Sequence, residues 1–173
     1  AAVVAMSAAQ ITAIATDDFA KLSTAAIRAI GNSAVAALTT AQVVALTTDQ
    51  VSKGLTTSQV AAMTTAGVTA VTTAGIAALT TDQVVALRTD QVAALRTSQV
   101  AALSTDGIAA METRDVAALD TEDLAAMSTS AIYGMDTDQV VALSTNQIQA
   151  LSTAQIKGMG SDQVAAMSTA QVV

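Results

Sequence analysis

The sequence contains no cysteine and no histidine. Their absence excludes disulfide bonds, thiolate chemistry and the commonest metal ligands of proteins. No Ser/His/Asp set, Cys/His pair or phosphate-binding loop occurs either. We therefore predict no catalytic, cofactor-binding or metal-ligating residues and no cofactor, and we expect that the protein is not an enzyme. Proline is also absent, so the turns of the chain cannot depend on its rigid ring.

Aromatic residues (1%) and charged residues (12%) are scarce, whereas hydrophobic residues make up 52% of the chain. The charged share is about half of that in an average soluble domain. A core built from small aliphatic side chains should be thin, regular and elongated. The net charge is 7 − 14 = −7 at pH 7. This charge disfavours nucleic-acid backbones and anionic membrane surfaces as partners.

Long hydrophobic runs are missing as well. The longest, Ala1 to Met6, is far shorter than the roughly 20 residues that span a bilayer. We therefore expect no membrane insertion. No basic segment followed by an apolar one marks a signal peptide at the start. The chain begins without methionine and stops within a repeat at Val172 and Val173, so we expect it to be a segment of a longer array. Residues 1–173 are expected to form a single repeat-array domain.

An eight-residue repeat runs through the sequence, and three consecutive copies span Thr80 to Leu103. They read TTDQVVAL, RTDQVAAL and RTSQVAAL. We number the positions from slot one (Thr80) to slot eight (Leu87). Slot two is almost always threonine, slot five is Val, Ile or Leu, slot seven is Ala or Gly, and slot eight is Leu or Met. Slots one and three carry nearly all the charge.

Each copy predicts one short helix. The Ala-Ala pair in slots six and seven favours a helix over a strand, and slots five and eight share a helical face. One continuous helix is disfavoured, because eight residues make about 2.2 turns and the apolar pair would rotate around it. Paired Ser/Thr hydroxyls can instead accept hydrogen bonds from the first amides of the next helix. Gln in slot four can complete a capping box. We predict helices of about six residues, each followed by a hydroxyl-capped corner.

The same frame extends to the N-terminal half. Asn32 occupies slot two and is expected to cap a helix as threonine does. Phe19, in slot five, is expected to be a core residue. One extra residue enters near 52–55, because Val51 and Val60 are nine apart. Gly54 could absorb it as a bulge or an altered helix end, and a hinge or binding kink is the alternative.

Short helices are marginal alone and must stack on neighbouring copies, which predicts an all-α solenoid. A longer period of 24 residues indicates three helices per turn, with two per turn as the alternative. It would also place Arg88 near Glu112 and Arg96 near Asp120. A recent duplication of three copies would leave the same trace. The residues that recur at this spacing include Ile108, Ile132, Ile156, Met111, Met135 and Met159.

Acidic residues concentrate between residues 106 and 138, where Arg114 is the one basic residue. Oxygen-rich clusters suit calcium, but neither EF-hand spacing nor a glycine- and aspartate-rich nonapeptide is present. We favour a solvated acidic face over a calcium site. The acids are Asp106, Glu112, Asp115, Asp120, Glu122, Asp123, Asp136 and Asp138.

Two resemblances follow from the repeat. The stretch Leu79 to Leu87 resembles the first helix of the repeats in transcription-activator-like effectors, which read DNA. Their second helix and base-reading loop have no counterpart here, and the acidic balance opposes DNA binding. From Ile11 to Val172, the chain resembles the Ala/Thr-rich octapeptide arrays of very large bacterial surface or secreted proteins. This resemblance implies an extracellular, adhesin-like or fibre-forming role.

Our functional hypothesis is a structural array, such as a stalk, spacer or filament component outside the bacterial cell. Its expected partners are copies of itself or flanking repeats of a longer chain, and not nucleic acid. The alternative is a binding module that presents regularly spaced threonines on a flat, weakly charged face to ice or carbohydrate.

Overall fold

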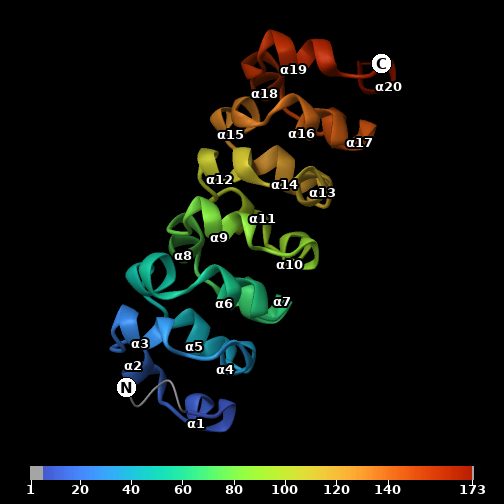
Figure 1. The fold of residues 1–173 in the computed structure, drawn as a ribbon. Helices are drawn as coiled ribbons and strands as arrows, with labels where there is room; N and C mark the ends of the chain where they lie inside the picture. The colour runs from blue at the N-terminus through green and yellow to red at the C-terminus, as the bar shows by residue number, and fades with distance from the viewer. Residues whose placement is uncertain (1–5, 173) are drawn as a thin grey trace.

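The computed structural model describes residues 6–172, and every regular element among them is a helix. Val3, which the repeat places in slot five, lies outside the described residues. The chain forms an all-α solenoid with one short helix per copy, as the sequence predicts (Figure 1). The elements are α1 (Ala8–Thr12), α2 (Thr16–Phe19), α3 (Thr24–Arg28), α4 (Asn32–Ala36), α5 (Thr40–Val44), the π-helix η2 (Gln50–Gly54), α6 (Thr57–Ala62), α7 (Thr65–Ala70), α8 (Thr73–Ala77), α9 (Thr81–Val85), α10 (Thr89–Ala93), α11 (Thr97–Val100), α12 (Thr105–Ala110), α13 (Thr113–Ala117), α14 (Thr121–Ala126), α15 (Thr129–Gly134), α16 (Thr137–Ala142), α17 (Thr145–Gln149), α18 (Thr153–Gly158), α19 (Ser161–Ala166) and α20 (Thr169–Val172).

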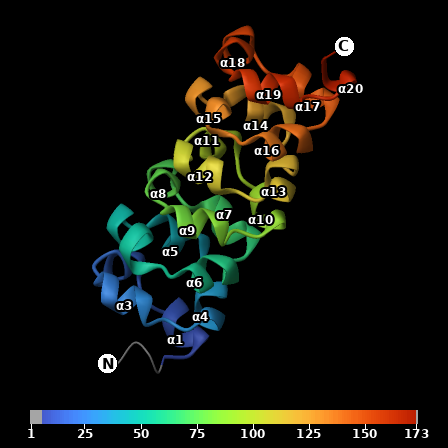
Figure 2. The ribbon, with the colours of Figure 1, turned by 45° about the horizontal axis from the view of Figure 1, so that its top comes forward.

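Three helices make one turn of the solenoid. The main contacts between helices join each one to the third element after it, for example α9 to α12 and α12 to α15. The alternative of two helices per turn is therefore wrong. The turns rise from the blue N-terminal end to the red C-terminal end as an elongated stack (Figures 1 and 2). Three columns result: column A (α1, α4, α6, α9, α12, α15, α18), column B (α2, α5, α7, α10, α13, α16, α19) and column C (α3, η2, α8, α11, α14, α17, α20).

Slots five and eight form one continuous core, as predicted. In the copy that begins at Thr80, Val84 and Leu87 are 2% and 3% exposed. Phe19 is completely buried, which confirms it as a core residue. Burying an aliphatic side chain of this size contributes about 1.5–3 kcal/mol. The short helices therefore gain their stability from contacts between turns and not from their own length.

The helix cap is slot one and not slot two. Thr80 has extended backbone angles, and its hydroxyl accepts a hydrogen bond from the Gln83 amide at 3.3 Å. Thr81, in slot two, is already the first helical residue. The prediction that Asn32 caps a helix is wrong for the same reason, since the N-cap of α4 is Gly31, which has no side chain to accept a bond. A cap position shifted by one residue leaves the slot-two threonine without a capping role.

Slot two instead faces slot seven of the helix one turn later. A Cβ added to Gly134, in slot seven of α15, would lie 2.7 Å from Cγ2 of Thr105 in α12. The equivalent Cβ on Gly158 would lie 3.6 Å from Cβ of Thr129. Small residues in slot seven therefore let the helices of successive turns approach closely.

The extra residue of the repeat lies in the π-helix η2. Its wider turn is closed by a hydrogen bond from the Leu55 amide to the Gln50 carbonyl at 2.9 Å. Val51 and Leu55 stay buried in slots five and eight, and η2 packs on α3. A Cβ on Gly54 would lie 3.1 Å from Cβ of Ile27, so this glycine permits the close packing. The register of the repeat thus continues unchanged beyond η2.

No helix within residues 6–172 combines the length and the apolar character that crossing a bilayer requires.

Candidate functional site

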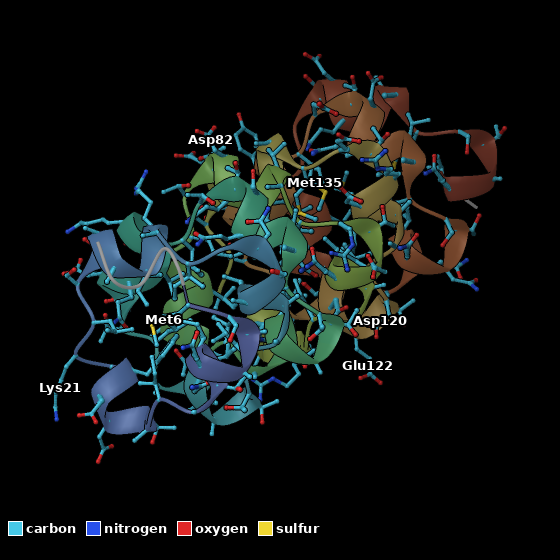
Figure 3. The ribbon with its side chains drawn as sticks, turned by 60° about the horizontal axis from the view of Figure 1, so that its bottom comes forward. Met6, Lys21, Asp82, Asp120, Glu122 and Met135 are labelled. Atoms are coloured by element: carbon cyan, nitrogen blue, oxygen red, sulfur yellow. The ribbon has the colours of Figure 1, made fainter. Side chains whose placement is uncertain are left out.

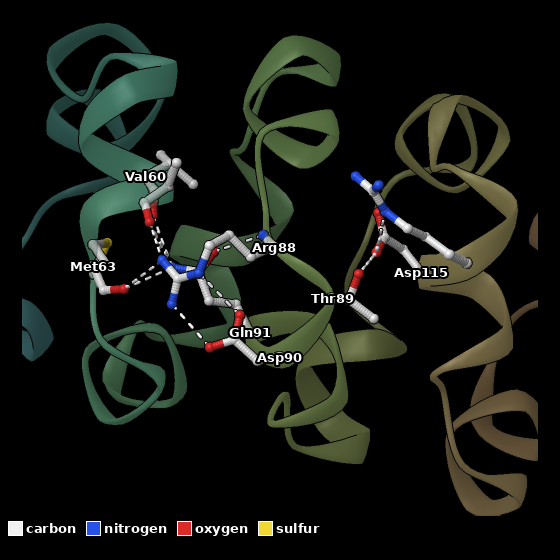
Figure 4. Close-up of polar contacts among 9 residues, drawn as sticks. Val60, Met63, Arg88, Thr89, Asp90, Gln91 and Asp115 are labelled. Atoms are coloured by element: carbon white, nitrogen blue, oxygen red, sulfur yellow. Dashed lines mark hydrogen bonds and ion pairs between the residues drawn. The ribbon is translucent and has the colours of Figure 1, made fainter.

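The contact between successive turns is built around a glutamine in slot four. Gln91 is fully buried, and its Oε1 accepts a hydrogen bond from the Arg88 amide at 2.8 Å. Its Nε2 donates to the carbonyls of Val60 (3.0 Å) and Met63 (2.7 Å), which end α6 one turn below (Figure 4). One side chain thus supplies an acceptor for an amide at the start of its own helix and a donor for two carbonyls at the end of another.

The arrangement recurs along the solenoid. In each case Nε2 donates to a slot-eight carbonyl of the preceding turn at 2.6–2.9 Å. The capping role of slot four was predicted, but its burial and its bond to the turn below were not. We call these residues the corner glutamines: Gln42, Gln50, Gln59, Gln83, Gln91, Gln99, Gln139, Gln147, Gln155, Gln163 and Gln171.

The arginines in slot one also reach the turn below. Arg88 donates to the carbonyls of Ala61 and Met63, and it pairs with Asp90 at 2.9 Å (Figure 4). Its guanidinium group lowers the pKa of the Asp90 carboxyl through a hydrogen bond and its charge. The predicted pairing of Arg88 with Glu112, 24 residues later, does not form in the described chain. Glu112 instead pairs within its own copy, with Arg114 at 2.8 Å.

Two copies have an aspartate in slot four, where the corner glutamines stand in other copies. Asp115 and Asp123 stand in slot four and are each 2% exposed, so the expectation of a wholly solvated acidic face is wrong for them. Asp115 accepts a hydrogen bond from the Thr89 hydroxyl at 2.5 Å (Figure 4). Asp123 receives the Asp120 amide on Oδ2 at 3.2 Å, while its buried Oδ1 has no partner. Burial raises the pKa of the Asp123 carboxyl.

The other acids of the 106–138 stretch are exposed. Asp120 and Glu122 lie at the outer edge of the molecule, whereas Met135 lies within it (Figure 3). Within residues 6–172, no group of three or more carboxylates is close enough together to hold a metal ion. The acids of this stretch are therefore exposed on the surface, except Asp115 and Asp123, which are buried between successive turns.

The outer face of column A carries a row of hydroxyl groups. Its charges are few, and most of its slot-one and slot-two side chains are serine or threonine. Because slot one forms the caps, the slot-two hydroxyls of this face have no capping role. They stack at the spacing of successive turns, and they belong to Thr57, Thr81, Thr105, Thr129 and Thr153.

The last described turn leaves part of the core pattern exposed. Ile156, Val164 and Val172 occupy slot five, and they are 38%, 45% and 64% exposed. In earlier turns the residues of this slot are covered by the next turn. The face of this turn is thus the same apolar surface that joins turns inside the solenoid.

Comparison with known families agrees with this geometry. A family model described as the ALTTAQ repeat matches overlapping segments that together cover most of the chain: residues 11–48, 36–65, 68–97, 76–113, 89–121, 116–153 and 146–173. The letters ALTTAQ occur as such at residues 37–42, where they run from slot seven to the corner glutamine Gln42. No curated protein matches the chain.

Proposed function

Because this chain belongs to the family of ALTTAQ-repeat proteins, we propose that it is a structural repeat protein without catalytic activity, a component of a fibre, filament or adhesin stalk outside the bacterial cell. The observation that carries the proposal is one kind of contact between turns, which the corner glutamines between Gln42 and Gln171 repeat in all three columns. A contact that repeats in this way sets no upper limit to the number of turns.

The expected partners are further turns of the same kind, in flanking repeats or in a second copy of the chain. The turn formed by α18, α19 and α20 presents exposed slot-five side chains, and a groove beside them is lined by Ile148, Leu151, Ile156, Val164 and Met167. Another turn docked there would bury these side chains as inner turns bury theirs. End-on stacking would then lengthen the solenoid without a new kind of contact.

Electron microscopy and sedimentation as a function of protein concentration test this proposal. We expect slender particles that lengthen with concentration, and we expect Ile156→Lys and Val164→Lys to prevent lengthening. Val141→Lys is the matched control, because Val141 is 49% exposed on the side of the solenoid and not at its end. Compact particles that never associate would contradict the structural role. Antibody labelling of intact cells tests the location, and labelling only after lysis would contradict it.

The row of hydroxyls on column A supports a second candidate, binding of ice or carbohydrate. Its slot-two threonines are free of a capping role, and they repeat at a fixed spacing on a weakly charged face. Ice growth and thermal hysteresis would be measured for the protein and for the variant Thr81→Lys, Thr105→Lys, Thr129→Lys. Carbohydrate binding would be measured with immobilised glycans. Absence of every effect in the unmodified protein would remove this candidate.

A further inference from the structure

An open hollow lies between two successive turns at the corner of columns A and B. It has a volume of about 510 Å³, and its lining includes Tyr133, Asp136, Thr137, Gly160, Ser161 and Asp162. Tyr133 lies in the last turn of α15, Asp136 begins the copy that forms α16, and Gly160 precedes α19 one turn later. The hollow thus combines an aromatic ring with two carboxylates.

Two departures from the repeat meet at this hollow. Tyr133 is the only tyrosine of the chain, and it stands in slot six, where the preceding turns of column A have Ala109 and Val85. The side chain is 63% exposed, so the ring contributes little to the core. Gly160 stands in slot one, where the preceding turns of column B have Asp136 and Glu112.

Neither the backbone nor the packing requires glycine at position 160. Its φ is −73°, which any residue can adopt. A Cβ there would lie 3.6 Å from Cε2 of Tyr133 and 3.7 Å from Oε1 of Gln163, at ordinary contact distances. The absence of a side chain also leaves α19 without a side-chain cap. What glycine does at this position is leave the tyrosine ring uncovered.

The charges around the ring are negative. Asp162 is exposed, and its Oδ1 accepts a bond from the Ser161 hydroxyl at 3.4 Å. Asp136 caps α16 by accepting the Gln139 amide at 2.7 Å, which leaves its second oxygen for another partner. No basic side chain lines the hollow, and Lys157, in slot six of the next turn, is not among the lining residues. A tyrosine ring beside carboxylates is a suitable environment for an organic cation.

We propose that this hollow binds an alkylammonium or guanidinium group, with the cation against the ring of Tyr133 and its charge facing Asp136 and Asp162. The group can belong to a lysine or arginine side chain of a protein or to a free organic cation. The proposal does not depend on end-on stacking, because the hollow lies on the side of the solenoid.

Fluorescence offers a direct measurement, since Tyr133 is the only tyrosine and tryptophan is absent. Tetramethylammonium, arginine amide and a short peptide with one arginine would be titrated at low salt. We expect saturable changes in tyrosine emission with a dissociation constant of about 1 mM, weaker at high salt. Tighter binding of the peptide than of arginine amide would indicate a polypeptide source, and equal binding a free cation. Absence of a response to all three would overturn the proposal.

Variants locate the site, with NMR amide shifts as the readout where tyrosine is lost. We expect Tyr133→Leu to weaken binding at least 5-fold and Asp162→Asn about 3-fold. Asp138→Asn is the matched control, because Asp138 is in the same slot one turn earlier and does not line the hollow. Gly160→Thr should restore a capping hydroxyl, cover the ring and abolish binding without lowering the unfolding temperature. Unchanged affinity in Tyr133→Leu and Gly160→Thr, or tighter binding of a neutral sugar than of the cations, would contradict the proposal.

Discussion

At the scale of single residues, slot four determines how two turns fit together. A glutamine amide carries an acceptor and two donors on one planar group. It can therefore accept from the cap amide of its own helix while it donates to carbonyls one turn below. An aspartate in the same slot can accept but cannot donate unless it is protonated. Gln99 and Asp123 lie in adjacent turns of column C and are examples of these two cases, so substitutions at both positions can be compared.

Replacing Gln99 by leucine should keep most of the buried volume and remove the hydrogen bonds. The Arg96 amide would lose its acceptor, which costs about 1–3 kcal/mol for a buried group. The carbonyls of Val68 and Val71 would lose the Gln99 donor but keep the Val71 amide and the Arg96 guanidinium. We expect Gln99→Leu to lower the free energy of unfolding by about 1–3 kcal/mol in urea denaturation. Gln10→Leu is the control, because Gln10 is exposed and bonds only within its own cap, and it should cost about 1 kcal/mol or less. Equal losses would show that the bonds between turns contribute little.

Asp123→Gln should place a corner glutamine between Gln99 and Gln147, which occupy the neighbouring turns of column C. We expect the free energy of unfolding at pH 7 to rise by about 1–3 kcal/mol, because a buried, unpartnered oxygen is replaced by a donor. Asp115→Gln should gain less, since Asp115 already has the Thr89 hydroxyl as a partner. Chemical denaturation of the three proteins checks this order.

The pH dependence of Asp123 follows from the direction of its pKa shift. Burial raises the pKa above 3.8, so between 3.8 and the raised value the folded chain binds more protons than the unfolded chain. The stabilising contribution of Asp123 is complete below 3.8 and is lost as the pH rises through the raised pKa. The advantage of Asp123→Gln should therefore be smaller at pH 4 than at pH 7. An advantage that grows on acidification would contradict this assignment.

At the scale of helices, the caps can be located by paired substitutions. Thr80→Ala removes the hydroxyl that accepts the Gln83 amide, and it should cost about 1 kcal/mol. Thr81→Ala, one residue later, changes a helical position and should stay within about 0.5 kcal/mol. Thermal unfolding of both variants distinguishes the two slots. A larger loss for Thr81→Ala would return the capping role to slot two.

The π-helix η2 provides a second test at this scale. Deleting Lys53 would leave TTDQVSGL from Thr47 to Leu55, which fits all eight slots. We expect the fold to persist, with a stability change within about 1 kcal/mol, although the bond from Arg28 to the Lys53 carbonyl is lost. Deleting Ala109 from α12 should cost more than about 3 kcal/mol, because Met111 would rotate away from the core. Circular dichroism melting measures the stability of both deletion variants. Similar losses for the two would contradict the assignment of the extra residue to η2.

The elements were predictable from the sequence because their determinants are local. Apolar residues in slots five and eight, small residues in slot seven and hydroxyls between copies are all visible within eight residues. The burial of Gln91 was not predictable in this way, because its carbonyl partners lie 28 and 31 residues earlier. Its recurrence in slot four was the available signal. The hollow at Tyr133 depends on Gly160 in the next turn, so it could be predicted only if the number of helices per turn were known.

At the scale of the whole molecule, stability should grow with the number of turns. Repeating residues 80–103 once after Leu103 adds three copies, which make one complete turn. We expect an unfolding temperature at least as high as that of the parent and a larger radius of gyration in solution scattering. Inserting residues 80–91 instead adds one and a half copies and should disrupt the fold. An unfolding temperature that falls after the addition of a full turn would contradict the additive model.

The three columns share one kind of corner, in which a capped helix follows the last turn of the helix before it, so one copy can take the place of another. A duplication of one copy would turn everything after it by a third of a revolution while the interior stayed intact. A duplication of three copies would only lengthen the rod. The number of copies before Tyr133 therefore sets the direction in which its ring faces around the solenoid axis. Adding or removing one copy would turn the hollow at Tyr133 to another side of the rod without changing any of its residues.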